Sequence, residues 1–158
     1  MKILVINGPN LNMLGRRNHK HYGSFTLDQI NTKLEKLAKP RDVKLVFFQS
    51  NHEGQLIDFI QKESSASSGI LINPGALTHY GYSLRDALED TNLPIIEVHL
   101  SDISKREDFR KIDVIKKISL AVVIGQKENS YILGLKKLII YIQESTLSEV
   151  RGRAKLTR

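Results

Sequence analysis

Short apolar runs alternate with segments of helical periodicity along the chain. The apolar runs predict strands over 2–6, 43–48, 69–73, 95–100 and 120–125. The periodic segments predict helices over 27–38, 53–62, 83–90 and 131–144, with a short one over 105–110. Strands that are apolar on both faces and separated by helices form a parallel sheet covered on both sides. With five strands, the sequence predicts an α/β fold with the doubly wound order 2-1-3-4-5.

The length of 158 residues fits one domain, which we expect to cover 1–150, followed by a basic tail over 151–158. There are no cysteines, which excludes disulfides, thiolate metal sites and cysteine nucleophiles. No apolar run approaches the roughly twenty residues needed to cross a bilayer. The N-terminus is typical of a first strand and too short for a signal peptide, so we expect a cytoplasmic protein.

The net charge of +7 suggests an anionic partner, but much of it lies at the C-terminus. The last eight residues hold four basic side chains and no acid: Arg151, Arg153, Lys155 and Arg158. A solvated, frayed end is the simpler interpretation. Nucleic acid is a less favoured partner, because no aromatic residues alternate with the basic ones.

The connection between the first strand and the first helix is about twenty residues long, whereas such connections usually take two to six. A loop of this length in a compact domain is usually functional or disordered. Leu11 and Leu14 are able to pack, and Arg17 and Tyr22 carry chemistry, so we expect a lid over about 10–24. Considered without its neighbours, Tyr22 would be a packing residue whose phenol has an ordinary pKa.

The predicted strand order places a ligand beyond the carboxyl ends of strands 1 and 3. Asn73 ends the third strand and His99 ends the fourth. His99 is either structural or a general acid or base oriented by Glu97, which lies on the same face of its strand. Asn73 is either a simple turn residue or part of a carboxylate site with the backbone amides of Leu100 and Ser101.

Other polar residues are open to two interpretations. His79 is similarly ambiguous, and Arg110 belongs either to a solvated basic face or to the site. His19 and His21 lack an evident third ligand, so we expect no metal. The glycine-rich motifs of dinucleotide and nucleotide triphosphate sites do not occur, so we expect no nucleotide cofactor.

Separated motifs lie at 6–12, 14–15, Arg17, 22–23, 49–54, 73–76, 78–79, 85–87 and 97–101. Together they cover about residues 1–110 and resemble the type II 3-dehydroquinate dehydratases. It implies a flavodoxin-like fold and a single catalytic domain. It also implies trans-dehydration of 3-dehydroquinate to 3-dehydroshikimate in the shikimate pathway, without cofactor or metal. The alternative is a non-catalytic protein of the same fold that binds a small anion or nucleic acid.

The resemblance also implies a role for each matching residue. Tyr22 would remove the C2 proton, Arg17 would keep that phenol anionic, Asn10 would hold a water at the enolate, and His99 would protonate the departing hydroxyl. The substrate would be bound by Asn73, His79, Leu100, Ser101 and Arg110. Asp86 would reach the site of a neighbouring subunit, since the family forms dodecamers built from trimers.

Some positions depart from the family pattern. Asn18 and His19 replace a usual Glu-Pro, Gly81 removes a hydroxyl donor, and Asp102 replaces a usual Asn beside the expected carboxylate site. The region after Ile112 diverges most. We expect these departures to affect lid closure, rate and oligomer packing more than the type of reaction.

Overall fold

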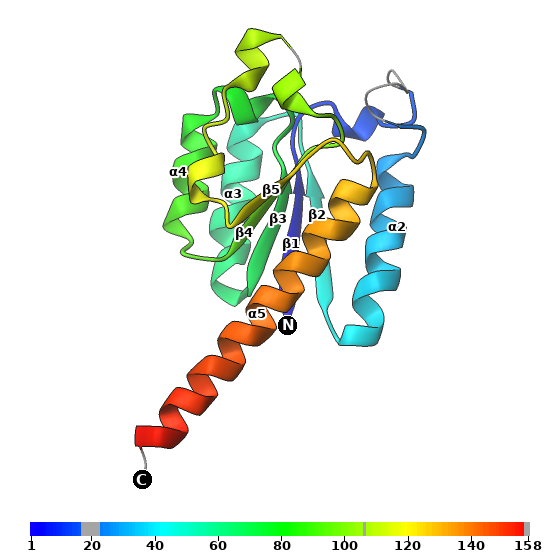
Figure 1. Cartoon of the computed structure of the whole chain (residues 1–158). Helices are drawn as coiled ribbons and strands as arrows, with labels where there is room; N and C mark the ends of the chain where they lie inside the picture. The colour runs from blue at the N-terminus through cyan, green and yellow to red at the C-terminus, as the bar shows by residue number, and fades with distance from the viewer. Residues whose placement is uncertain (17–22, 106, 157–158) are drawn as a thin grey trace.

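Five parallel strands form one sheet in the order β2-β1-β3-β4-β5, which confirms the predicted topology (Figure 1). The computed structural model describes residues 1–16, 23–105 and 107–156, with side chains described through 148. The strands are β1 (Lys2–Asn7), β2 (Lys44–Gln49), β3 (Gly69–Asn73), β4 (Ile95–Val98) and β5 (Ala121–Val123). All lie at the predicted places, although β4 and β5 are shorter than expected.

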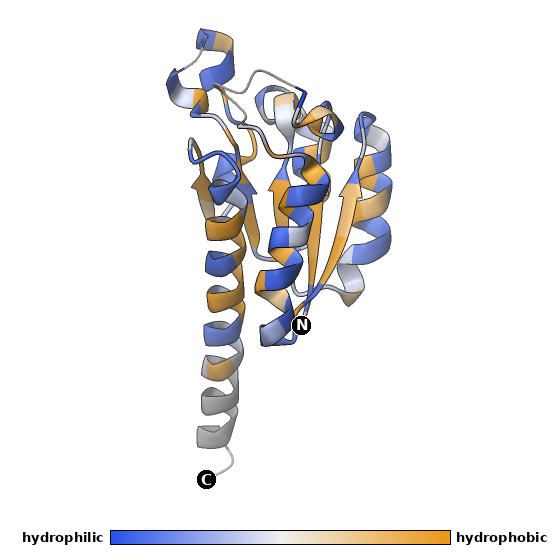
Figure 2. Ribbon diagram, turned by 90° about the vertical axis from the view of Figure 1, so that its right-hand side faces the viewer, coloured by the Kyte–Doolittle hydropathy of each residue, from blue (hydrophilic) through white to orange (hydrophobic). Residues whose placement is uncertain are grey.

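Helices cover both faces of the sheet, as Figure 1 shows. They are α2 (Leu27–Ala38), α3 (Glu53–Glu63), α4 (Tyr82–Asp90) and α5 (Asn129–Leu156). Side chains of β1 alternate between two cores: Ile3 and Val5 pack with α2 and α5, and Leu4 and Ile6 pack with α3 and α4. Both faces of the central strands are therefore apolar, and Figure 2 shows the strands as hydrophobic ribbons between amphipathic helices.

The first helix begins at a capping box. The Gln29 backbone N–H donates to Thr26 Oγ1 over 3.2 Å, and the Thr26 N–H donates to Gln29 Oε1 over 2.9 Å. Each side chain satisfies a backbone donor that the helix itself leaves without a partner. The cap fixes where the chain enters α2 after the long connection.

Two predicted helices differ in the structure. The last one was expected over 131–144, but α5 continues to Leu156 and projects beyond the sheet (Figure 1). Residues 145–156 contain no proline and several good helix formers, so nothing stops the helix near 144. The short helix expected over 105–110 is instead two 3-10 turns, Ile103–Lys105 and Asp108–Lys111.

The carboxyl ends of the strands meet at one rim. The connection after β1 enters the 3-10 turn Leu11–Met13 and buries Leu14. Glycines with positive φ, Gly15 and Gly23, lie just outside the undescribed segment 17–22. In the described part of the chain, no helix combines the length and the apolar character needed to cross a membrane.

Candidate active site

A cavity of about 160 Å³ lies at the rim, between the connections that follow β1, β3 and β4. This is the position at which the strand order reverses, where ligands bind in doubly wound sheets. The two connections on its floor approach closely: the Gly8 N–H donates to the Asn73 carbonyl over 2.8 Å. A Cβ at Gly8 would collide with the Pro74 carbonyl, so only glycine permits this approach. Six predicted site residues line the cavity: Asn10, Asn73, His79, His99, Leu100 and Arg110.

His99 follows β4 and is paired with a buried carboxylate. Its Nε2 lies 2.8 Å from Glu97 Oε1, and the two side chains are 6% and 0% exposed. A carboxylate oxygen accepts a hydrogen bond, so Nε2 is the donor and the ring keeps Nδ1 for other partners. A buried histidine held in one orientation at a cavity is the arrangement that general acid catalysis requires.

Thr78 connects that pair to a second carboxylate. The Thr78 hydroxyl lies 2.6 Å from Glu97 Oε1 and 3.1 Å from Asp113 Oδ1. It has one proton, so it donates to one of these carboxylates at a time. Asp113 Oδ1 also accepts from the backbone N–H groups of Ile115 and Lys116. Among the described residues, Glu97 Oε2 is buried without a hydrogen-bond partner.

Asn73 belongs to a different network below the cavity. Its Nδ2 donates to the Tyr131 hydroxyl over 2.9 Å, and that hydroxyl donates to Asn7 Oδ1 over 2.6 Å. The three residues are at most 2% exposed. Burial raises the pKa of the Tyr131 phenol well above its ordinary value, against a smaller opposite effect of the Asn73 hydrogen bond. Tyr131 is therefore poorly suited to act as a base, and it does not line the cavity.

Hydrogen bonds and an ion pair to neighbouring loop residues hold the other side chains that line the cavity. His79 Nδ1 donates to the Ile112 carbonyl over 2.6 Å, which leaves its Nε2 for a ligand. Arg110 is ion-paired with Glu107, with Arg110 Nε 3.0 Å from Glu107 Oε2. The Asn10 N–H donates to Asn51 Oδ1 over 2.9 Å, and Asn10 has a left-handed backbone, φ 65°, that asparagine tolerates.

The remaining predicted site residues lie elsewhere. Ser101 is half-buried beside Leu100 but does not line the cavity. Asp86 lies on α4 with its side chain 67% exposed, and it accepts from Arg85 Nη1 over 3.0 Å. Tyr22 and Arg17, together with His19 and His21, lie outside the described residues.

The part of the chain that the structure describes holds one group of possible metal ligands. Atoms of Glu97, His99 and Asp113 lie within 4.8 Å of one another. However, Glu97 Oε1 already faces His99 and Thr78, and Asp113 Oδ1 already accepts two backbone N–H groups. A cation bound through Glu97 Oε1 and Asp113 Oδ1 would have to replace these hydrogen bonds, and His99 Nε2 would lose its carboxylate partner.

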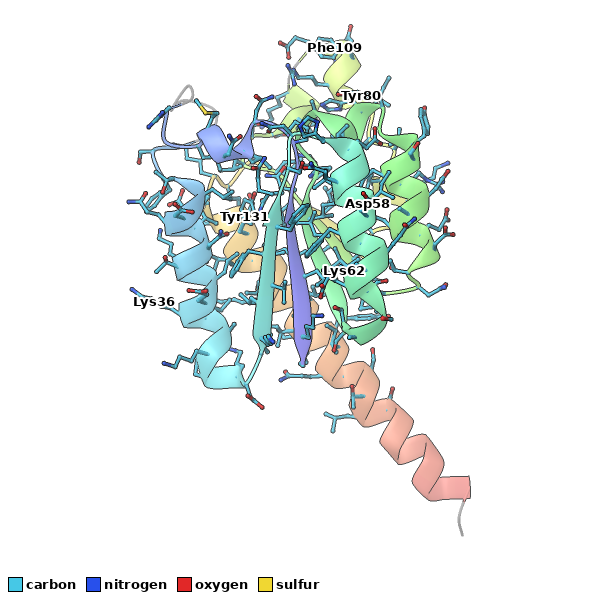
Figure 3. The ribbon with its side chains drawn as sticks, turned by 180° about the vertical axis from the view of Figure 1, so that it is seen from behind. Lys36, Asp58, Lys62, Tyr80, Phe109 and Tyr131 are labelled. Atoms are coloured by element: carbon cyan, nitrogen blue, oxygen red, sulfur yellow. The ribbon has the colours of Figure 1, made fainter. Side chains whose placement is uncertain are left out.

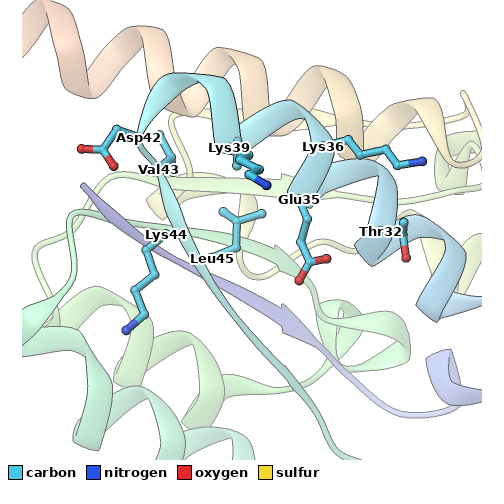
Figure 4. A pocket seen from close by; sticks show the side chains of 9 residues that line it. Thr32, Glu35, Lys36, Lys39, Asp42, Val43, Lys44 and Leu45 are labelled. Carbon is cyan, nitrogen blue, oxygen red and sulfur yellow. The ribbon is translucent and has the colours of Figure 1, made fainter.

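A wider hollow of about 510 Å³ lies between α2 and the beginning of β2, at the opposite end of the sheet. Figure 4 shows its rim of lysine and carboxylate side chains, including Lys36, Lys39 and Glu35. These are solvated groups of both signs on an open surface, without a histidine or a buried carboxylate. The cavity at the rim is therefore the candidate site, although it is the smaller one.

Comparison with known proteins shows which family the chain belongs to. A family model described as dehydroquinase class II matches residues 1–139. The chain belongs to this family. It is 54% identical over 139 residues to the 3-dehydroquinate dehydratase of Roseiflexus castenholzii, covering 88% of each chain. It is 46% identical to the enzyme of the same name from Halothermothrix orenii, covering 92% of this chain and 98% of that one.

Solved structures of the class II dehydroquinase family have the same fold. The type II dehydroquinase from Butyrivibrio crossotus superposes with a TM-score of 0.84 at 42% identity, covering 87% of this chain and 97% of that chain. That from Propionibacterium acnes gives a TM-score of 0.82 at 34% identity, covering 87% and 94%. The family match ends near Ile139, so the projecting turns of α5 lie outside it.

The structure shows how the charge of Asp102, one of the departures from the family pattern, is accommodated. Asp102 was expected to place a negative charge beside the carboxylate site. Its Oδ1 instead accepts from the Ser104 hydroxyl over 2.6 Å and the Ser104 N–H over 3.1 Å, and its Oδ2 lies 3.3 Å from Lys105 Nζ. The hydrogen bond from Ser104 and the contact with Lys105 lower the pKa of Asp102, which therefore stays ionised. The charge is held by its own turn, and Asp102 does not line the cavity.

Sequence reasoning missed the residues that support the lining. Thr78 and Asp113 are 35 positions apart, and no local sequence pattern predicts their hydrogen bond. For Tyr131, the sequence did contain an indication of its role. It shares the apolar face of α5 with Leu135 and Leu138, and all three are fully buried. A buried tyrosine hydroxyl usually has a hydrogen-bond partner, which would have directed attention to the polar strand ends.

Proposed function

We propose that this chain is a type II 3-dehydroquinate dehydratase, a hydro-lyase that converts 3-dehydroquinate to 3-dehydroshikimate by trans-elimination of water. The observation that carries the proposal is the buried His99–Glu97 pair at a small polar cavity, in a chain of this family. We place the reaction in the shikimate pathway and the protein in the cytoplasm.

The reaction needs a base at the carbon beside the ketone, stabilisation of the enolate and an acid at the leaving hydroxyl. His99 supplies the acid through Nδ1, while Glu97 stabilises the imidazolium form through Nε2. Asn10 holds the water that stabilises the enolate oxygen. Tyr22 is the base, and Arg17 keeps it anionic when the lid over about 10–24 closes.

The substrate carboxylate binds to the Asn73 amide and to the backbone N–H groups of Leu100 and Ser101. His79 and Arg110 bind the hydroxyl groups on the other side of the cavity, which both residues line. No cofactor or metal takes part. Two carboxylate oxygens of the Glu97–His99–Asp113 group, Glu97 Oε1 and Asp113 Oδ1, already take part in hydrogen bonds, which supports an acid–base route.

The protein also self-associates, with trimers as the inner unit of a homododecamer. The family resemblance implies that Asp86 reaches the site of a neighbouring subunit, and its exposure on α4, away from its own cavity, leaves it available for that contact. We expect light scattering to give the mass of twelve subunits, or at least of a trimer. An active monomer would contradict the role of Asp86.

A binding protein for a small anion or nucleic acid is the alternative. Nothing in the comparisons favours it, and a binding protein needs no buried histidine–carboxylate pair. An activity measurement separates the two functions directly.

The test is an absorbance assay for the conjugated enone of 3-dehydroshikimate, using purified protein and 3-dehydroquinate. We expect turnover that survives exhaustive dialysis against EDTA, because the mechanism uses side chains alone. The His99→Ala variant, prepared in parallel, controls for a contaminating enzyme. Absence of turnover would contradict the proposed function. Loss of activity with EDTA that a divalent ion restores would contradict the cofactor-free mechanism.

A further inference from the structure

We infer that Tyr131 is a positioning residue that fixes the side-chain amide of Asn73 with an N–H toward the cavity, and so selects a carboxylate there. The inference rests on the proposed function, because it concerns how the same cavity recognises the acid group of the substrate. It assigns a role to a side chain of α5 that lies below the cavity and does not line it.

The three side chains meet because two strands end in register. Asn7 and Asn73 are paired residues at the carboxyl ends of β1 and β3. Tyr131 lies in the first turn of α5, on the face that packs against the sheet (Figure 3). Its hydroxyl reaches both amides, 2.6 Å from Asn7 Oδ1 and 2.9 Å from Asn73 Nδ2. A single phenol therefore bridges the ends of two neighbouring strands.

The direction of every hydrogen bond in this network follows from one backbone group. The Gly75 N–H lies 3.1 Å from the Asn73 side chain, and a backbone N–H can only donate. The atom that it meets is therefore the amide oxygen, and the opposite end of Asn73 is the NH₂ group. That group donates to the Tyr131 hydroxyl, whose own proton then goes to Asn7 Oδ1.

Asn73 keeps one N–H after these bonds are made. Its oxygen is held by Gly75 and one N–H by Tyr131, and the residue lines the cavity. A spare N–H can only donate, and its hydrogen bond is strongest to a charged acceptor such as a carboxylate. Because burial raises the pKa of the phenol, its hydroxyl keeps the proton that it donates to Asn7 Oδ1.

Removing the hydroxyl should loosen this arrangement. The Tyr131→Phe variant would leave Asn73 Nδ2 and Asn7 Oδ1 without the hydrogen bonds to the phenol, and the Asn73 amide would lose one of its two anchors. The effect should appear in the binding of the carboxylate, since the side-chain hydrogen bonds of the network reach neither His99 nor Asn10. It should spare the chemical step.

The experiment compares Tyr131→Phe with wild type in turnover of 3-dehydroquinate and in calorimetric binding of 3-dehydroshikimate and its methyl ester. We expect KM and the Kd of the acid to rise roughly tenfold. We expect kcat and the Kd of the ester to change less than about threefold. Ser130→Ala is the matched control: Ser130 is equally buried in the same turn, but its hydroxyl accepts from the Gln126 N–H. It should match wild type in all four quantities.

Two further variants test whether Tyr131 acts through Asn73. In an Asn73→Ala background, Tyr131→Phe should add little, because the residue through which it acts is gone. Asn7→Leu removes the acceptor of the phenol proton and should reproduce the weaker acid binding, so the inference stays testable if Tyr131→Phe folds poorly. Equal weakening of acid and ester, or a full effect of Tyr131→Phe without Asn73, would overturn it. Because product binding needs no turnover, an inactive wild type would contradict the proposed function alone.

Discussion

His99→Ala should reduce kcat by about 10²–10⁴ while KM changes little. The imidazole is expected to donate its proton to the departing hydroxyl, and that transfer occurs only in the transition state. In the structure the ring is held by Glu97, 2.8 Å away, at the edge of the cavity. Binding of the substrate should instead depend on Asn73 and the neighbouring backbone amides. Steady-state kinetics with 3-dehydroquinate measure both quantities.

His52→Ala is the control for that measurement, because His52 is exposed at the start of α3 and does not line the cavity. It should keep wild-type kinetics. Glu97→Gln preserves size but removes the charge that favours the imidazolium form, so its kcat should fall between wild type and His99→Ala. If His99→Ala raised KM with kcat unchanged, His99 would be a binding residue and the assignment of the acid would be wrong.

Tyr22→Phe should lower kcat by at least about 10³, and Arg17→Ala should have a similar effect. An ordinary phenol with a pKa near 10 is only about one part in a thousand ionised at pH 7. Making it a base requires a shift of about three units, or ~4 kcal/mol. One close cation in a site without water is of that order, whereas an exposed ion pair falls short. Arg17 is therefore expected to act with the lid closed.

The double variant Tyr22→Phe with Arg17→Ala should be little worse than either single change, because the two residues act as a unit. Arg17→Lys should recover only part of the rate, since a point charge does not reproduce the planar guanidinium. Tyr141→Phe is the matched control, on a partly exposed tyrosine of α5. Near-wild-type turnover of Tyr22→Phe would show that another group is the base. Tyr131 is a poor substitute, because burial raises its pKa and its proton is held by Asn7.

The sheet and the position of the cavity were predictable because they depend on local periodicity. Apolar runs such as 69–73 have one stable placement, in the middle of a parallel sheet, and the strand order then fixes which connections meet. His99 and Asn73 stood out since polar residues directly follow apolar strands. These predictions needed only the neighbours of each residue along the chain.

The supporting contacts were not predictable, because they join distant positions whose geometry depends on packing. Asn7 and Tyr131 are 124 positions apart, and their hydrogen bond forms because the first turn of α5 packs near the ends of β1 and β3. Asp113 reaches Thr78 because the Val114 N–H donates to the Thr78 carbonyl, which ties two loops together. The end of α5 was missed because its last turns are rich in charged residues, which occur both in helices and in solvated tails.

The long helix α5 also sets the distance between the cavity and the end of the helix at Leu156. Tyr131 lies at its first turn beneath the cavity, and Leu156 ends it after 25 further residues, or about 38 Å at 1.5 Å per residue. Figure 1 shows that end on the far side of the sheet from the rim. A dye, surface anchor or second enzyme joined after Leu156 would therefore be attached at a helix length from the reacting atoms. The C-terminus is thus the favourable point for immobilising this protein or coupling it to another catalyst.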